Sequence, residues 1–171
     1  MTFKKKSFNY YLREYGPYLA VIVIVLLVKQ FLFSPVMVSG ESMINTLKDS
    51  DIMIMDKISL STSPIKRFEI VVISYKNRYL IKRVVGLPGE TIEYKDNKLY
   101  VNGEFIEETF LDKEQITKDF SVKVPDDFYF VLGDNRVNSN DSRYLGCFSL
   151  EKIEGRTSFT IFPFSRFGKK E

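Results

Sequence analysis

Short stretches in which apolar and polar residues alternate are the dominant pattern of this 171-residue chain. A period of two, bounded by Gly, Pro, Asn or Asp, is typical of half-buried β-strands. The pattern therefore predicts strands at 36–38, 52–55, 70–73, 79–85, 91–94, 98–101, 120–124, 128–132 and 157–162. The expected fold class is mostly β, an antiparallel sheet or barrel-like domain.

One segment breaks this pattern, because the residues from Tyr18 to Val28 are apolar without interruption and the run resumes up to Phe33. Its 16 residues fall short of the roughly 20 that cross a bilayer as a helix. A snorkelling Lys29 extends the span. A cleavable signal peptide has an apolar region of about 7–15 residues, but no Ala-x-Ala follows here. We therefore predict one uncleaved transmembrane helix at 17–34.

Basic residues concentrate before this run. The formal net charge is +3, yet residues 1–29 hold five basic side chains against one acidic one. The positive-inside rule then makes 1–16 a cytoplasmic basic tail and 35–171 an extracytoplasmic domain of a single-pass protein of the cell membrane. Within that domain, residues 104–119 are charged and lack a clear period, which predicts a surface insertion. The rest of the chain is close to neutral, so nucleic acid is not an expected partner.

Two residue counts restrict the chemistry. The chain has no histidine, which removes Ser-His dyads and His-ligated metals. Its single cysteine, Cys147, allows neither an internal disulfide nor a cysteine-ligated metal. We expect no metal and no cofactor. A hydrolase built from this chain must take its base from a lysine, a carboxylate or the amino terminus.

A lysine suited to that task lies in the strand predicted at 79–85. In a strand of period two, Lys82 shares a face with Leu80 and Val84, whereas Arg83 lies on the other face. A lysine on an apolar face loses hydration, which lowers its pKa by up to about 3–5 units and lets the amine accept a proton from a serine. The strand alone equally allows Arg83 to face inward and Lys82 to face water.

Four motifs, in this order, resemble those of bacterial type I signal peptidases. They are the serine turn at 40–47, the Lys82-Arg83 strand with Gly-Leu-Pro-Gly after it, the loop from Gly-Asp-Asn-Arg to Asp-Ser-Arg at 133–143, and Ile-Glu-Gly-Arg at 153–156. Together with the anchor they cover nearly the whole chain. The small size and single anchor are similar to the Gram-positive form.

The resemblance implies a membrane-bound serine endopeptidase that removes the signal peptides of exported preproteins after small residues, of the Ala-x-Ala type. The implied partners are those signal peptides, membrane lipid and a nearby secretion translocon. By position, Ser42 would be the nucleophile, Lys82 the general base, and Ser139 the hydroxyl that orients the amine. The supporting residues would be Asp141 and Arg143, paired as a salt bridge, with Asp134, Arg136 and Arg83.

The resemblance also implies where the substrate lies. An extended peptide would add as a strand between 36–38 and the Leu80-Ile81 segment. The residues offered to its small side chains are Val38, Met43, Leu47, Leu80 and Ile81. All of these apolar residues equally suit an ordinary core.

Three departures from the family pattern are Asn45 in place of a proline, Arg67-Phe68-Glu69 in place of Arg-Gly-Asp, and Cys147 where an aliphatic residue would be unremarkable. These departures keep open a catalytically impaired, membrane-anchored homologue that binds exported peptides. A second alternative is a self-cleaving repressor-type Ser/Lys peptidase. Retention of Ser42 and Lys82 argues against the first alternative, and the anchor argues against the second.

Overall fold

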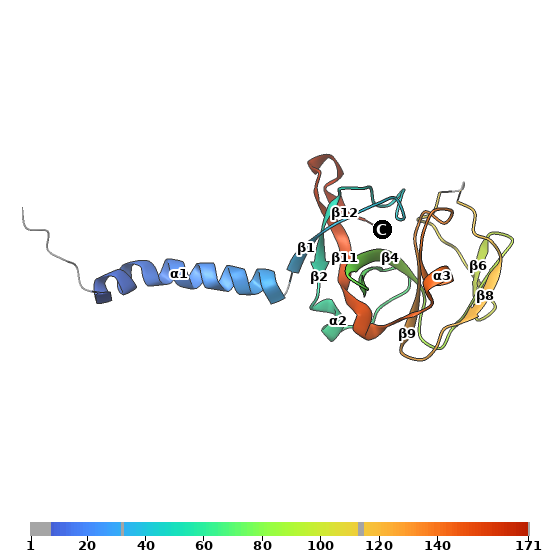
Figure 1. The fold of residues 1–171 in the computed structure, drawn as a ribbon, viewed down its shortest axis with the longest axis horizontal. Coiled ribbons are helices and arrows are strands. Elements are labelled where there is room, and N and C mark those ends of the chain that lie inside the picture. Colours follow the sequence, from blue (N-terminus) through green and yellow to red (C-terminus); the bar gives the residue numbers. More distant parts are fainter. Residues whose placement is uncertain (1–7, 32, 113–114, 171) are drawn as a thin grey trace, which may run out of the picture.

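The computed structural model describes residues 8–31, 33–112 and 115–170. Helix α1 projects from one side of a β domain, and the small sheet with β6 and β8 lies at the opposite side (Figure 1). The helices among the described residues are α1 (Phe8–Phe31), α2 (Ser59–Thr62) and α3 (Ser142–Leu145), with the 3-10 turns η1 (Leu150–Lys152) and η2 (Phe164–Arg166). The strands are β1 (Phe33–Met37), β2 (Ile52–Asp56), β3 (Ile70–Tyr75), β4 (Arg78–Gly86), β5 (Thr91–Lys95), β6 (Lys98–Val101), β7 (Glu104–Ile106), β8 (Phe120–Lys123), β9 (Phe128–Leu132), β10 (Phe148–Ser149), β11 (Ile153–Phe162) and β12 (Gly168–Lys169).

These strands form two sheets. The larger has the order β1-β2-β11-β3-β4-β9-β10, with β12 added to β11, and the smaller has the order β7-β6-β5-β8. Every pairing in the described residues is antiparallel. The prediction of a mostly β, antiparallel domain is therefore confirmed.

Strand β4 is central to the larger sheet. It pairs with β3 from Arg78 to Arg83, and with β9 only from Arg83 onward. From Ile81 to Gly86 every side chain is buried, so both faces of the strand are covered. A strand covered on both faces does not show the alternation of one buried and one wet face. Lys82 and Arg83 are therefore both inside, whereas the sequence pattern offered a choice between them.

The two sheets pack tightly against each other at Gly86. A Cβ there would lie 2.7 Å from the Ile92 side chain of β5, and 2.9 Å from both Phe130 and Val124. Gly86 is therefore required by packing. Around it, Val85, Ile92, Val124, Phe130 and their neighbours form an apolar cluster that joins the sheets.

The predicted strands are present, but three short ones were missed. Strands β7, β10 and β12 have two or three residues each, too few to show any period. Strand β11 also starts at Ile153, four residues before the predicted strand at 157–162.

The predicted anchor range of 17–34 is part helix and part strand, because it includes the end of α1 and the start of β1. Helix α1 begins at Phe8 and contains Pro17. Strand β1 begins at Phe33, and its backbone pairs Ser34 with Met55 of β2. In the described part of the chain, no helix combines the length and the hydropathy that crossing a bilayer requires.

The charged segment 104–119 is more than a surface insertion. Most of its described residues are exposed, but β7 completes the small sheet, and Glu108, Phe110 and Thr117 point inward. Thr117 is 3% exposed, and the Phe110 ring lies 3.9 Å from the Arg83 guanidinium. Each of these three residues contacts an arginine that is distant in sequence, so the local pattern could not reveal its role.

Candidate active site

The structure brings Ser42 and Lys82 into direct contact. Lys82 Nζ lies 2.6 Å from Ser42 Oγ, across 40 residues of sequence. Lys82 is 3% exposed, whereas Ser42 is half-buried. A hydroxyl open to the solvent side thus meets an amine that is shielded from water.

Burial is the main influence on the lysine. Loss of hydration lowers the pKa of Lys82 from 10.5 to about 8, against the opposing effect of the carboxylates of Asp141 and Asp134. No ion pair of the described residues includes Lys82. A substantial fraction of this amine is consequently neutral near pH 8, and a neutral amine can accept a proton.

A tight turn presents Ser42. The turn starts at Gly40, whose φ of +88° lies in the left-handed region that glycine adopts without strain. Leu47 N donates to Met43 O at 2.8 Å and closes the far end. The side chains of Met43 and Leu47 are buried in the core, and this packing anchors the turn to the domain.

Arg83 is held by an ion pair behind the same turn. Its Nη2 lies 2.7 Å from Asp134 Oδ2 and its Nε 2.9 Å from Asp134 Oδ1, and both side chains are 2% exposed. Thr46 of the serine turn donates to the same carboxylate at 2.5 Å. The pair thus joins β4, the serine turn and the loop after β9.

Phe68, where the family pattern has glycine, also contacts Arg83. Its φ is +70°, a region that favours glycine, the residue that the resemblance implied at this position. Hydrogen bonds fix this backbone, since Phe68 N donates to Val84 O at 2.7 Å and Arg83 Nη1 donates to Phe68 O at 2.8 Å. Its ring packs edge-on against Phe110, with 5.0 Å between centroids.

The loop from Gly133 to Arg143 is organised by Asp141. The predicted salt bridge is present, with Arg143 Nη2 at 2.8 Å and Nε at 2.9 Å from the two carboxylate oxygens. Gly133 N donates to Asp141 at 2.9 Å. Burial acts to raise the pKa of Asp141, but the hydrogen bonds from Arg143 and Gly133 outweigh it and leave that pKa below its usual value.

Ser139 does not make the predicted contact with Lys82. Its hydroxyl is buried and lies against Gly133, where an added Cβ would be 2.2 Å from Ser139 Oγ. It lies near enough to Asp141 to help lower the pKa of that carboxyl. No hydrogen bond of regular geometry reaches Ser139 Oγ from any described residue. Ser139 thus has no hydrogen bond to the Lys82 amine in this structure, and its orienting role stays a prediction.

Arg136 is fully buried and has a partner that the sequence analysis missed. Its Nη2 lies 2.6 Å from Glu108 Oε1, and its guanidinium also donates to Tyr94 and Thr117. The Tyr94 hydroxyl lies 2.8 Å from both Glu108 oxygens. A buried arginine needs a carboxylate partner. The sequence analysis could have looked for that partner of Arg136 and so found Glu108.

The predicted substrate residues fall into two groups. Val38, Met43, Leu47 and Ile81 share one apolar cluster and are between 0% and 8% exposed. Leu80 packs at the margin of a different cluster. The first four are thus brought together in the packed core, and their contact with substrate side chains stays a prediction.

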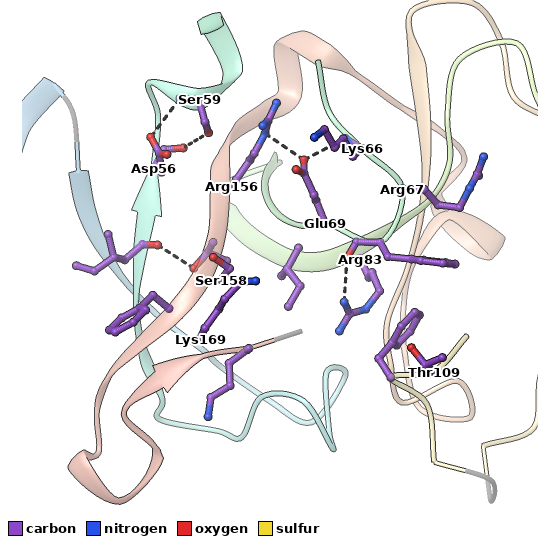
Figure 2. A pocket seen from close by; sticks show the side chains of 17 residues that line it. Asp56, Ser59, Lys66, Arg67, Glu69, Arg83, Thr109, Arg156, Ser158 and Lys169 are labelled. Carbon is purple, nitrogen blue, oxygen red and sulfur yellow. Dashed lines mark hydrogen bonds and ion pairs between the residues drawn. The ribbon is translucent and has the colours of Figure 1, made fainter. Parts of the chain in front are cut away.

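A separate cavity of about 870 Å³ lies against Arg83 and is shown in Figure 2. Its labelled basic residues outnumber the acidic ones, and Arg156 pairs with Glu69 at 3.2 Å on its wall. Ser42 and Lys82 do not line it. The contact between the serine and the lysine therefore lies outside this cavity.

Comparisons with known proteins define the class. The sequence profile of the family described as signal peptidase, peptidase S26, matches residues 12–162. A signal peptidase I of Bacillus amyloliquefaciens is 42% identical over 86% of this chain and 86% of its own length. Signal peptidase I T of Bacillus subtilis strain 168 is 40% identical over 96% of this chain and 91% of its own length.

A solved structure agrees with these sequences. The crystal structure of a signal peptidase I from Enterococcus faecalis V583 is 36% identical, with a TM-score of 0.51, and covers 55% of this chain and 97% of that one. The chain therefore belongs to the signal peptidase family, peptidase S26, whose members are serine endopeptidases.

Replacing Lys82 by methionine tests the burial of the amine. Between a folded pKa of about 8 and an unfolded pKa of 10.5, the unfolded chain binds more protons, so wild-type stability rises with pH across that window. Below pH 8 the folded protein bears the full cost of burying the ammonium. We expect Lys82→Met to unfold with a free energy higher by about 1–3 kcal/mol at pH 7, and the gain to shrink by pH 10. Urea denaturation at several pH values measures this.

The exposed Lys98 supplies the control. Lys98→Met should change the free energy of unfolding by less than about 0.5 kcal/mol at every pH. A Lys82→Met protein less stable than wild type at pH 7 would contradict a desolvated amine.

Proposed function

We propose that this protein is a signal peptidase I that removes signal peptides from exported preproteins with a Ser42–Lys82 dyad. The 2.6 Å contact between the Ser42 hydroxyl and the buried Lys82 amine is the observation that carries the proposal. Membership of the family supports the activity, and the absence of histidine from the sequence leaves lysine as the base nearest the serine.

The proposed reaction proceeds in two steps. Ser42 Oγ attacks the scissile carbonyl carbon while neutral Lys82 accepts the hydroxyl proton. The resulting ammonium donates that proton to the departing amide nitrogen, which becomes the amino terminus of the mature protein. A water molecule then attacks the acyl-enzyme, with Lys82 as base, and releases the signal peptide. The Ser42 N–H is the proposed donor to the developing oxyanion, as the resemblance implies.

The substrate is proposed to bind as an added strand. Among the described strands, residues Arg78–Lys82 of β4 pair only with β3, so the other edge of this segment is open. Strand β1 likewise pairs only with β2. Val36, Val38 and Ile81 share one cluster, so the two edges lie near each other. A peptide between them would gain main-chain hydrogen bonds, and the packed core beneath would leave room for small side chains alone. That limit is consistent with cleavage after Ala-x-Ala.

The membrane anchor belongs to the same proposal. The apolar run to Phe33, the basic residues before it and the position of α1 ahead of the β domain support a single-pass anchor with its amino terminus in the cytoplasm. The catalytic domain from residue 35 would then meet preproteins on the outer side, near the translocon.

Loss of either dyad member tests the proposed function directly. Ser42→Ala and Lys82→Ala should each reduce cleavage of a preprotein in detergent by about 10²-fold or more, because each removes half of a two-group reaction. Mass spectrometry of the new amino terminus should place the cut after Ala-x-Ala. A folded wild-type protein that binds signal peptides without cleaving them would instead identify an impaired homologue.

The pH dependence of cleavage should report the state of Lys82. Because the neutral amine is the active form, kcat/KM should rise with pH, with an apparent pKa of about 8, and level off above it. Initial rates on a peptide substrate between pH 6 and pH 10 measure this, with single-turnover experiments to isolate the chemical step. A flat profile for the chemical step would exclude Lys82 as base.

Protease added to intact spheroplasts checks the topology. It should digest residues 35–171 and leave a membrane-bound amino-terminal fragment, since the anchor would shield the region before it. Digestion after lysis in detergent is the control. Protection of the whole chain in intact spheroplasts would overturn the proposed orientation.

A further inference from the structure

Glu108, in the segment that follows β7, binds the fully buried guanidinium of Arg136. Its oxygens lie 2.6 and 3.2 Å from Arg136 Nη2 and Nη1, and the side chains of Glu108 and Arg136 are 9% and 0% exposed. Tyr94 adds a hydrogen bond of 2.8 Å to the same carboxylate. The carboxylate is thus fixed from two sides and in turn fixes the guanidinium.

Arg136 holds the backbone of the loop through its other groups. Its Nε donates to Gly133 O at 3.1 Å, and its main-chain N–H donates to Gln115 at 2.8 Å. Arg143 Nη1 donates to Arg136 O at 2.7 Å. The positions of residues 133–136 therefore depend on where the Arg136 side chain is held.

Gly133, Asp134 and Asn135 of this segment touch the serine turn. Asn135 N donates to Ser42 O at 3.1 Å, and Asn135 Nδ2 donates to Glu41 O at 3.2 Å. Gly133 lies so close that an added Cβ would be 2.4 Å from Ser42 O. The loop thereby holds two successive carbonyl groups of the turn, those of Glu41 and Ser42, in place.

We propose that Glu108 is a positioning residue for the nucleophile: acting through Arg136 and residues 133–136, it sets the orientation of Ser42. The inference rests on the proposed function in taking Ser42 as the nucleophile. Without the carboxylate, the buried guanidinium loses its direct ion-pair partner and turns toward water, because leaving it unpaired inside is costly. The Gly133 carbonyl then loses its donor, and the loop releases the Ser42 carbonyl.

A displaced nucleophile affects the rate more than binding. A shift of about 1 Å in a reacting group costs up to about 10²-fold in rate. The substrate edges on β1 and β4 do not involve Glu108. The charges that act on the Lys82 amine are those of Asp141, Asp134, Arg143 and Arg78. Removing Glu108 should thus lower the rate plateau without moving the midpoint of the pH profile.

The experiment compares Glu108→Gln with Glu90→Gln in the full-length protein. Glu90 forms a similar ion pair, 2.5 Å from Arg67 with side chains 17% and 19% exposed, but contacts neither residues 133–136 nor the serine turn among the described residues. Well below both melting temperatures, we expect Glu108→Gln to lower kcat by about 10–100-fold with KM within threefold. Glu90→Gln should keep kcat within twofold.

Two further measurements separate positioning from general damage. In an Arg136→Lys background, which lowers kcat by itself, Glu108→Gln should add less than twofold, because the two residues act in series. Acylation of Ser42 by a small serine-directed reagent, followed by mass spectrometry, should slow in parallel with kcat. This second assay needs no preprotein, so it tests positioning even if the wild type cleaves none.

Several outcomes would overturn the inference. They are an unchanged kcat and acylation rate in folded Glu108→Gln, a loss confined to KM, an equal loss in Glu90→Gln, or additive losses with Arg136→Lys. If Glu108→Gln does not fold, Glu108→Asp takes its place under the same criteria, because its shorter side chain keeps the charge but withdraws the contact.

Discussion

The structure depends on one constraint: the Lys82 amine is kept from water while it contacts the half-buried Ser42 hydroxyl, the pair that we propose as the catalytic dyad. Desolvation is what lowers the pKa of Lys82, so every element that covers β4 contributes to the reactivity of the site. A central strand of a single sheet with one wet face could not do this. Here the second sheet, the serine turn and the loop after β9 enclose the strand on both faces.

The two neighbouring basic residues of β4, Lys82 and Arg83, differ in whether a carboxylate pairs with them. Arg83 meets Asp134 in a two-point ion pair, so its charge is compensated inside the protein. The carboxylate of Asp141 acts on Lys82 over a distance, but its oxygens are occupied by Arg143 and Gly133 N. The carboxylates of Asp134 and Asp141 thus form their ion pairs with arginines, which remain charged. Lys82 has no ion pair among the described residues, so its ammonium can lose a proton.

The sequence predicted the β class, most strands and the residues that meet at Ser42, because alternation and motif order are local signals. The strand pattern alone could not decide between Lys82 and Arg83, since the rule of one buried face fails for a strand covered on both sides, and the choice of Lys82 came from the family resemblance. The sequence analysis predicted a contact between the Ser139 hydroxyl and Lys82, whereas that hydroxyl, which packs close to Gly133, has no hydrogen-bond partner among the described residues. Glu108 escaped notice because nothing in a charged, aperiodic segment marks the carboxylate whose partner lies 28 residues away.

Long separations in sequence have a consequence for when this protein becomes active. The serine turn is held by Asp134 and Asn135, which lie 88 and 94 residues further along the chain from their partners in the turn. Contacts of such separation form late, because closing a long loop costs entropy before any contact repays it. A nascent chain that already carries both Ser42 and Lys82 still lacks the contacts that hold the serine turn. The activity proposed for this pair would thus wait until nearly the whole domain has been synthesised and folded.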